Sequence, residues 1–269
     1  MLTLSLSQFT FRRPEREHDV DSLNFDAAGY LIDLDGTLIS GRQALPDALW
    51  LLEQVAGRFM LVSNDAEHTP EQLSRMLRPL GLAIRPERIV LAGMTAVDTI
   101  ATDYPGASVM LLGSSSLRAY ARHRGLWLDG PKTDVVLVMR DRKFSYAKLA
   151  AAADAVHRGA RLVAACPDTS HPGPLGQPVP ETGALAAAIL SVAGPAPMRV
   201  IGKPEPILFE AACARLGIVP RDAVMVGDNP ATDGQGASRL GMTFWQVRHG
   251  RLRGNLNLVH SALPEAVPA

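Results

Sequence analysis

The chain has 269 residues, of which 47% are hydrophobic and 20% charged, a composition typical of globular proteins and unlike that of disordered chains. Its 27 basic and 27 acidic residues give a formal net charge of zero, which argues against a nucleic-acid binder that relies on a broad basic field. Two cysteines are too few for a disulfide scaffold, so we expect reduced thiols in a cytoplasmic protein.

Residues 1–24 are predicted to be an N-terminal extension of the folded protein. The first eleven residues are mildly apolar and a charged stretch follows them, whereas a secretory signal begins with charge. The chain contains no run of about 18 apolar residues, so we expect no membrane partner.

The next part of the chain alternates short apolar strands with helices. Residues 30–32 form an apolar run that ends at DLDGT (33–37), and residues 59–62 form a second run that ends at SND (63–65). Residues 69–81 begin with Thr-Pro and end with Gly, which is typical of a capped helix. Buried strands alternating with helices predict a parallel sheet covered on both faces.

A second α/β unit is predicted for residues 104–196. It alternates strands with helices, contains a Pro- and Gly-rich loop at 167–180, and ends at a Gly-Pro-Ala-Pro linker. Residues 197–269 then resume the earlier style, beginning with a strand at 198–201. The simplest organisation is a core domain built from residues 1–103 and 197–269, with the second unit inserted between them.

Polar residues follow several predicted strands of the core. They are Asp33 with Asp35, Ser63 with Asn64, Lys203, and Asp228 with Asp233. Because the carboxyl ends of parallel strands face one crevice, we expect these side chains to lie together. Crowded carboxylates repel one another unless a cation lies among them, and oxygen ligands suit Mg²⁺. Taken singly, each residue has an ordinary explanation, such as a turn cap for the acids or a surface position for the lysine.

Together, these groups match the needs of phosphoryl transfer. A lysine and small polar donors neutralise phosphoryl oxygens. One carboxylate can attack phosphorus and form an aspartyl-phosphate. A second acid two residues further on can protonate the leaving alcohol and then take a proton from water.

Four motifs resemble those of the haloacid dehalogenase superfamily, in the order that the family has. They are DLDGTL at 33–38, Ser63-Asn64, GKPEP at 202–206 and GDNPATD at 227–233. The resemblance covers residues 25–250. Residues 134–141, 146–155, 159–160 and 166–168 are similar to the inserted cap of the type IIA branch, which includes NagD-like proteins and 4-nitrophenylphosphatases. This family resemblance implies a doubly wound, Rossmann-like core with an inserted α/β cap domain of the C2 type.

The resemblance also implies a role for each matching residue. Asp33 is the expected nucleophile and a magnesium ligand, and Asp35 is the expected general acid and base, with its backbone carbonyl on the metal. Lys203 stabilises the phospho-aspartate, Asp228 binds the metal directly, and Asp233 supports the metal without binding it. Ser63 and Asn64 are expected to hold phosphoryl oxygens.

Three positions depart from the pattern. Asp65 stands where relatives often have Asn, and its extra charge weakens phosphate binding unless it points away. Arg140 stands where relatives often have an aromatic or small residue, and His171 occupies a cap-loop position that faces substrate in some relatives. We interpret Arg140 and His171 as substrate-specificity residues, with a solvated surface position for Arg140 as the alternative.

The predicted function is Mg²⁺-dependent hydrolysis of a small phosphomonoester. The candidates are a sugar phosphate, glycerol phosphate, a nucleoside monophosphate and pyridoxal phosphate. Two alternatives stay open: a regulatory protein that binds a phosphorylated ligand with little turnover, and a phosphotransferase. The resemblance further implies a homodimer formed through the cap.

Overall fold

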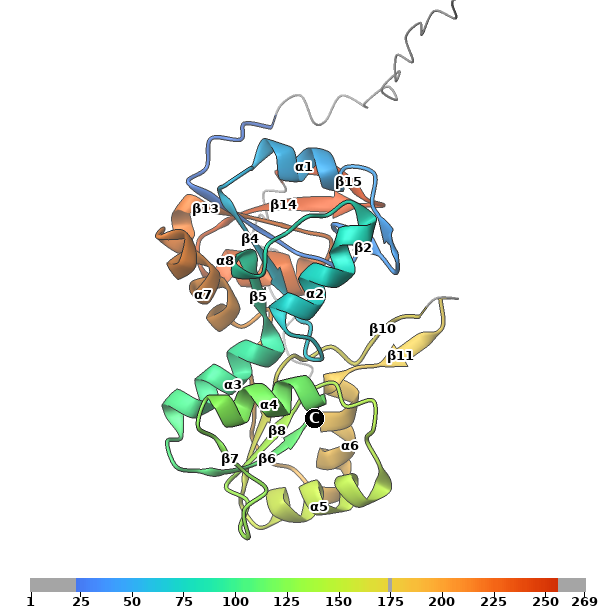
Figure 1. Ribbon diagram of the computed structural model, residues 1–269, viewed down its shortest axis with the longest axis vertical. Helices are drawn as coiled ribbons and strands as arrows, with labels where there is room; N and C mark the ends of the chain where they lie inside the picture. Colours follow the sequence, from blue (N-terminus) through green and yellow to red (C-terminus); the bar gives the residue numbers. More distant parts are fainter. Residues whose placement is uncertain (1–22, 174–175, 256–269) are drawn as a thin grey trace, which may run out of the picture.

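The computed structural model describes residues 23–173 and 176–255. Two sheets, each flanked by helices, form two units that lie one above the other (Figure 1). Of the predicted extension 1–24, residues 1–22 lie outside the described residues, as do residues 256–269.

The first unit is built on a six-stranded sheet. Its strands are parallel except for the two that come last in the chain, β14 and β15, which pair with each other in the antiparallel direction. In sheet order they are β15 (Arg251–Asn255), β14 (Thr243–Arg248), β13 (Ala223–Gly227), β1 (Gly29–Ile32), β4 (Phe59–Ser63) and β5 (Ile89–Leu91). A two-stranded hairpin, β2 (Ile39–Ser40) and β3 (Gln43–Ala44), lies directly after the DLDGTL motif.

Alternate strand residues face opposite helical layers of this unit. Tyr30 and Ile32 pack in the cluster that holds α1 (Ala48–Gln54) and α2 (Pro70–Leu77). Leu31, between them, packs with α7 (Pro206–Leu216) and α8 (Gln235–Arg239) on the other face. Helices on both faces explain why the strands are apolar throughout, and the predicted doubly wound core is confirmed. Short helical turns complete the unit: η1 (Arg78–Leu80), η2 (Pro86–Arg88), η3 (Pro220–Asp222) and η4 (Pro230–Gly234).

The second unit, which we call the cap, is built on a parallel sheet of five strands. In sheet order they are β12 (Met198–Val200), β9 (Arg161–Ala164), β8 (Val135–Val138), β6 (Ser108–Leu112) and β7 (Trp127–Leu128). Helices α3 (Ala92–Asp103) and α4 (Ser115–His123) pack together on one face, and α5 (Tyr146–His157) and α6 (Thr182–Ala193) pack on the other. Figure 1 places this unit in the lower half of the molecule.

The cap differs from the prediction in three respects, the first of which is that α3, predicted within core residues 1–103, packs against α4 of the cap. The Pro-rich loop predicted at 167–180 contains a hairpin, β10 (Ser170–Pro172) and β11 (Pro178–Pro180), because proline is tolerated in a two-stranded ribbon whose strands are both edges. The strand predicted at 198–201 pairs with β9 rather than with the core sheet, so the chain returns to the core after Val200 and not at 197. A short apolar strand carries no signal for which of two parallel sheets it joins.

Within the described part of the chain, no helix has both the length and the apolar character needed to cross a bilayer.

Candidate active site

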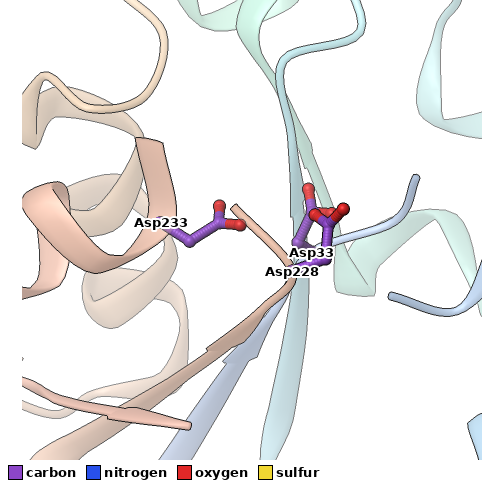
Figure 2. A group of neighbouring side chains, drawn as sticks. All are labelled: Asp33, Asp228 and Asp233. Atoms are coloured by element: carbon purple, nitrogen blue, oxygen red, sulfur yellow. The ribbon is translucent and has the colours of Figure 1, made fainter. Parts of the chain in front are cut away.

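The core sheet brings three of the predicted polar residues to one edge. Asp33 directly follows β1, Ser63 ends β4, and Asp228 directly follows β13. These three strands are neighbours and run parallel, so their carboxyl ends open on the same side. Figure 2 shows the Asp33 and Asp228 side chains together at this edge, with Asp233 extending toward them from a helical segment.

Lys203 is buried at the centre of this group. Its ammonium Nζ lies 2.5 Å from Asp33 Oδ1 and 2.7 Å from Asp233 Oδ1, and it donates to the Val62 carbonyl at 3.1 Å. Burial alone lowers the pKa of a lysine, but the carboxylates of Asp233 and Asp33 outweigh it and raise the pKa of Lys203. Lys203 is therefore a permanently charged cation that bridges two acids.

Oxygen atoms of Asp33, Asp228 and Asp233 all lie within 4.8 Å of one another. Burial and the nearby charge of Asp33 raise the pKa of Asp228 to about 6. The same two effects raise the pKa of Asp233 to about 7, although Lys203 opposes them. The single charge of Lys203 does not neutralise three neighbouring carboxylates. Their oxygen atoms are suitable ligands for a divalent cation such as Mg²⁺.

Gly36 allows the acids to approach one another this closely. It has a φ of +82°, and a Cβ atom added there would lie 2.1 Å from Asp228 Oδ2. Any other residue would push the Asp228 carboxylate out of the cluster.

Asp35 lies beside this cluster and is exposed. Packing of protein atoms around its carboxyl group, followed by the charges of Asp33 and Asp65, raises the pKa of Asp35 to about 7. A carboxyl group with a pKa near neutrality can both donate and accept a proton at physiological pH.

The two residues predicted to hold phosphate have different surroundings. The Ser63 hydroxyl is buried and accepts the Asp65 backbone N–H at 3.1 Å, which leaves its own proton for another acceptor. The Asn64 side chain is already engaged in three hydrogen bonds with Lys203 and the cap residue Asp168. A phosphate contact through the Asn64 side chain would break one of them.

The extra charge of Asp65 is bound within its own loop. Asp65 Oδ1 accepts the backbone N–H groups of Glu67 and His68 at 2.8 Å each, and Oδ2 pairs with His68 Nδ1 at 2.7 Å. Burial opposes ionisation, but the contacts with His68 prevail and lower the pKa of Asp65. Its carboxylate is therefore held by His68 and the backbone rather than left open to an incoming phosphate.

Arg140 and His171 lie together on the cap, in a polar network with two glutamates in which Arg140 is the charged partner. Arg140 Nη1 lies 3.2 Å from Glu67 Oε2 on the core and 3.4 Å from Glu181 Oε1 on the cap. His171 Nδ1 lies 2.7 Å from the same Glu181 oxygen. Arg140 is thus half-buried and joins cap to core, which differs from a solvated surface position. A contact of Arg140 or His171 with substrate stays a prediction.

Sequence analysis does not identify Glu67, Glu181 or Asp168 as site residues. Glu67 and Glu181 stand outside the four motifs, and no spacing relates either to Arg140. For Asp168 the available signal is its place at the end of a predicted cap strand, in the segment Cys166-Pro167-Asp168 that resembles the family cap.

Glu181 predicts a measurable pH dependence of stability. Burial raises its pKa to about 7 against the opposing charge of Arg140, while Asp65 and Asp168 also raise it. A raised carboxyl pKa stabilises the fold below the unfolded-state value, and this contribution is lost as pH rises toward 7. We therefore expect Glu181→Gln to gain stability over the wild type between pH 5 and pH 8, by about 1 kcal/mol or roughly 2–4 °C in Tm.

The measurement is thermal unfolding of both proteins across this pH range. Glu210→Gln, on the exposed side of α7, is the matched control and should show a constant difference from the wild type. A Glu181→Gln difference that shrinks as pH rises would contradict the burial argument.

Comparisons with known proteins agree with this geometry. A family model described as haloacid dehalogenase-like hydrolase matches residues 30–127, and a second HAD-like hydrolase model matches residues 200–266. An acid sugar phosphatase from Staphylococcus aureus strain USA300 is 33% identical over 225 residues, which are 82% of this chain and 86% of that protein.

Solved structures of similar proteins superpose on most of the chain. A glycerol phosphate phosphatase from Mycobacterium tuberculosis, in complex with magnesium, is 33% identical with a TM-score of 0.77 over 84% of this chain and 68% of that one. NagD from Escherichia coli K-12 is 26% identical with a TM-score of 0.76 over 84% of this chain and 88% of that one. The chain therefore belongs to the haloacid dehalogenase-like hydrolases, in the type IIA branch that includes NagD and the 4-nitrophenylphosphatases.

Proposed function

We propose that the protein is a Mg²⁺-dependent phosphatase that hydrolyses a small phosphomonoester through a phospho-aspartate. The observation that carries this proposal is the buried Lys203 ammonium between Asp33 and Asp233, beside the further acids Asp35 and Asp228. This arrangement supplies a nucleophile, a fixed positive charge and a proton carrier in one place.

In the first step, Asp33 attacks phosphorus and the ester bond to the leaving oxygen breaks. Asp35, whose raised pKa of about 7 keeps a share of its carboxyl groups protonated near neutral pH, gives its proton to that oxygen, so the alcohol leaves uncharged. In the second step, Asp35 takes a proton from water, which attacks the phospho-aspartate. Phosphate is released and the Asp33 carboxylate is restored. Lys203 offsets the negative charge that develops on the phosphoryl oxygens, and Ser63 offers them its hydroxyl proton.

Asp33, Asp228 and the backbone carbonyl of Asp35 would hold Mg²⁺, with Asp233 supporting them through its contact with Lys203. When bound, the ion supplies positive charge that draws the phosphate and the nucleophilic carboxylate together.

We infer that the substrate is a sugar phosphate or a polyol phosphate such as glycerol phosphate. The inference is supported by the relatives named acid sugar phosphatase and glycerol phosphate phosphatase. The test is phosphate release from a panel of sugar, glycerol, nucleoside and pyridoxal phosphates, with 4-nitrophenyl phosphate as a general reporter. If no member of the panel released phosphate in the presence of Mg²⁺, the proposed activity would be refuted.

Removal of Mg²⁺ is expected to affect both activity and stability. A chelator should abolish hydrolysis of 4-nitrophenyl phosphate, and added Mg²⁺ should restore it. Because the acids must be ionised to bind the ion, Mg²⁺ should raise Tm more at pH 8 than at pH 5.5. Hydrolysis that continues in excess chelator would contradict the role assigned to the acid cluster.

We further propose that the protein acts in the cytoplasm as a homodimer formed through the cap. The buried, unpaired thiols of Cys166 and Cys213 support a reducing compartment. The dimer rests on family resemblance, and sedimentation of the purified protein would test it.

A further inference from the structure

Lys203 lies at the point where the chain leaves the cap and returns to the core. Strand β12 ends at Val200, and its pairing continues beyond that residue. Ile201 N donates to the Ala164 carbonyl at 3.1 Å, and Gly202 N donates to the Ala165 carbonyl at 2.8 Å. The backbone that carries Lys203 is thus attached to the cap sheet, whereas its ammonium group lies among the acids of the core.

Asn64, directly after core strand β4, forms hydrogen bonds with both the N–H and the carbonyl of Lys203. Asn64 Oδ1 accepts the Lys203 N–H at 2.8 Å, and Nδ2 donates to the Lys203 carbonyl at 3.1 Å. The approach requires glycine at 202, since a Cβ atom there would lie 2.5 Å from Asn64 Oδ1 and 2.7 Å from the Ala165 carbonyl. The Asn64 amide therefore connects the core strand to the segment that returns from the cap.

Asp168 fixes the orientation of this amide from the cap. Asn64 Nδ2 donates a second hydrogen bond to Asp168 Oδ2 at 3.0 Å. A flipped amide would set its oxygen against the Asp168 carboxylate and the Lys203 carbonyl, two acceptors that repel it. Asp168 is itself held to the cap, because Gly183 N, in the first turn of α6, donates to the Asp168 carbonyl at 2.7 Å.

We propose that Asp168 is a positioning residue that couples the placement of the cap to the placement of the Lys203 ammonium, through the hydrogen bonds Asp168–Asn64–Lys203. With Asp168 in place, Asn64 has one amide orientation and the Lys203 backbone is held at both its N–H and its carbonyl. Without it, the Lys203 backbone alone orients the amide, so Asn64 is held less firmly and its link to the cap at Asp168 is lost. The inference rests on the proposed function, in which Lys203 stabilises phosphoryl charge.

The test compares Asp168→Ala with Asp168→Asn, measuring kcat and KM for 4-nitrophenyl phosphate and for glycerol phosphate. Asp168→Ala should lower kcat roughly tenfold, or about 1.36 kcal/mol, for both substrates. KM should change little, because Asp168 is proposed to act through Asn64 and Lys203 rather than on the substrate. Asp168→Asn should recover most of kcat, since its amide oxygen still accepts from Asn64 Nδ2.

Asp154→Ala, on cap helix α5 where Asp154 pairs with the exposed Arg158, is the control and should behave as the wild type. Tm of each variant separates loss of folding from loss of coupling. If Asp168→Ala unfolds, Asp168→Ser, whose hydroxyl is too short to reach Asn64, takes its place with the same expected loss.

Unchanged kcat in Asp168→Ala would overturn the inference. A loss confined to glycerol phosphate and expressed in KM would also overturn it, because Asp168 would then contact the leaving group. Equal losses in Asp168→Ala and Asp168→Asn would likewise overturn it, because the hydrogen bond to Asn64 would then not be what matters. Wild-type hydrolysis in the same assay tests the proposed function separately: an active wild type with unaffected Asp168 variants rejects the coupling alone.

Discussion

Asp33→Asn should abolish hydrolysis of 4-nitrophenyl phosphate, with a fall in kcat of at least about a thousandfold, or roughly 4 kcal/mol of barrier. The amide has nearly the shape of the carboxylate, but its nitrogen and neutral oxygen are poor nucleophiles toward phosphorus. The variant also removes one negative charge from a cluster in which Asp228 and Asp233 have raised pKa values. Because Lys203 keeps Asp233 as a charged partner, the variant should stay folded in the absence of Mg²⁺.

A folded, inactive Asp33→Asn protein separates loss of the nucleophile from loss of structure. The matched control is Asp222→Asn, an exposed aspartate of the core whose nearest cation, Arg221, is 3.9 Å away. It should keep wild-type kcat and Tm. Asp33→Asn that retains more than a few per cent of kcat would show that no phospho-aspartate forms on this residue.

Lys203→Met should impair both stability and activity. Methionine fills a similar volume without charge, so Asp33 and Asp233 would face each other with no cation between them. Removing one partner of a buried ion pair costs about 3–5 kcal/mol of unfolding free energy. Loss of one fixed charge from the phosphoryl site should lower kcat by about 10²–10³.

The stability loss in Lys203→Met should depend on pH. Without the lysine, the folded-state pKa of the facing acids rises further above the unfolded-state value, so the deficit grows as pH rises. Denaturant unfolding at pH 5 and pH 8 measures this, and the deficit relative to the wild type should be larger at pH 8. Lys132→Met, at a largely exposed lysine of the cap, is the control. If the loss of unfolding free energy did not depend on pH, it would arise from altered packing rather than from the missing charge.

The motifs of the core were predictable because each stands next to an apolar strand. Asp33, Ser63 and Asp228 follow or end β1, β4 and β13, and parallel strands necessarily bring those ends together. The placement of Lys203 in the site was predictable from its motif. It was not predictable from a core strand, because the strand before it, β12, belongs to the cap sheet. The predicted meeting of Lys203 with Asp33 nevertheless agrees with the geometry.

The surroundings of these residues were less predictable. The position of Asp65, directly after Ser63 and Asn64, predicts a negative charge near the phosphate site. In the structure its oxygens are bound by His68 and two backbone N–H groups. Asn64 looks like a phosphate ligand by position, but its side chain is engaged with Lys203 and Asp168. The partners of Asn64 lie more than a hundred positions away in sequence, whereas those of Asp65 lie within three residues of it.

The amino-acid sequence by itself determined the chemistry of this protein: an alternation of strands and helices, a set of acids with one lysine, and the order of four motifs. Those properties depend on residue type and local spacing, which a linear chain carries in full. Only the tertiary structure decided which sheet receives β12, how the cap meets the core through Arg140 and Glu67, and which side chain orients Asn64. These contacts join segments remote in sequence, and they form only when two packed units bring polar groups within hydrogen-bond distance.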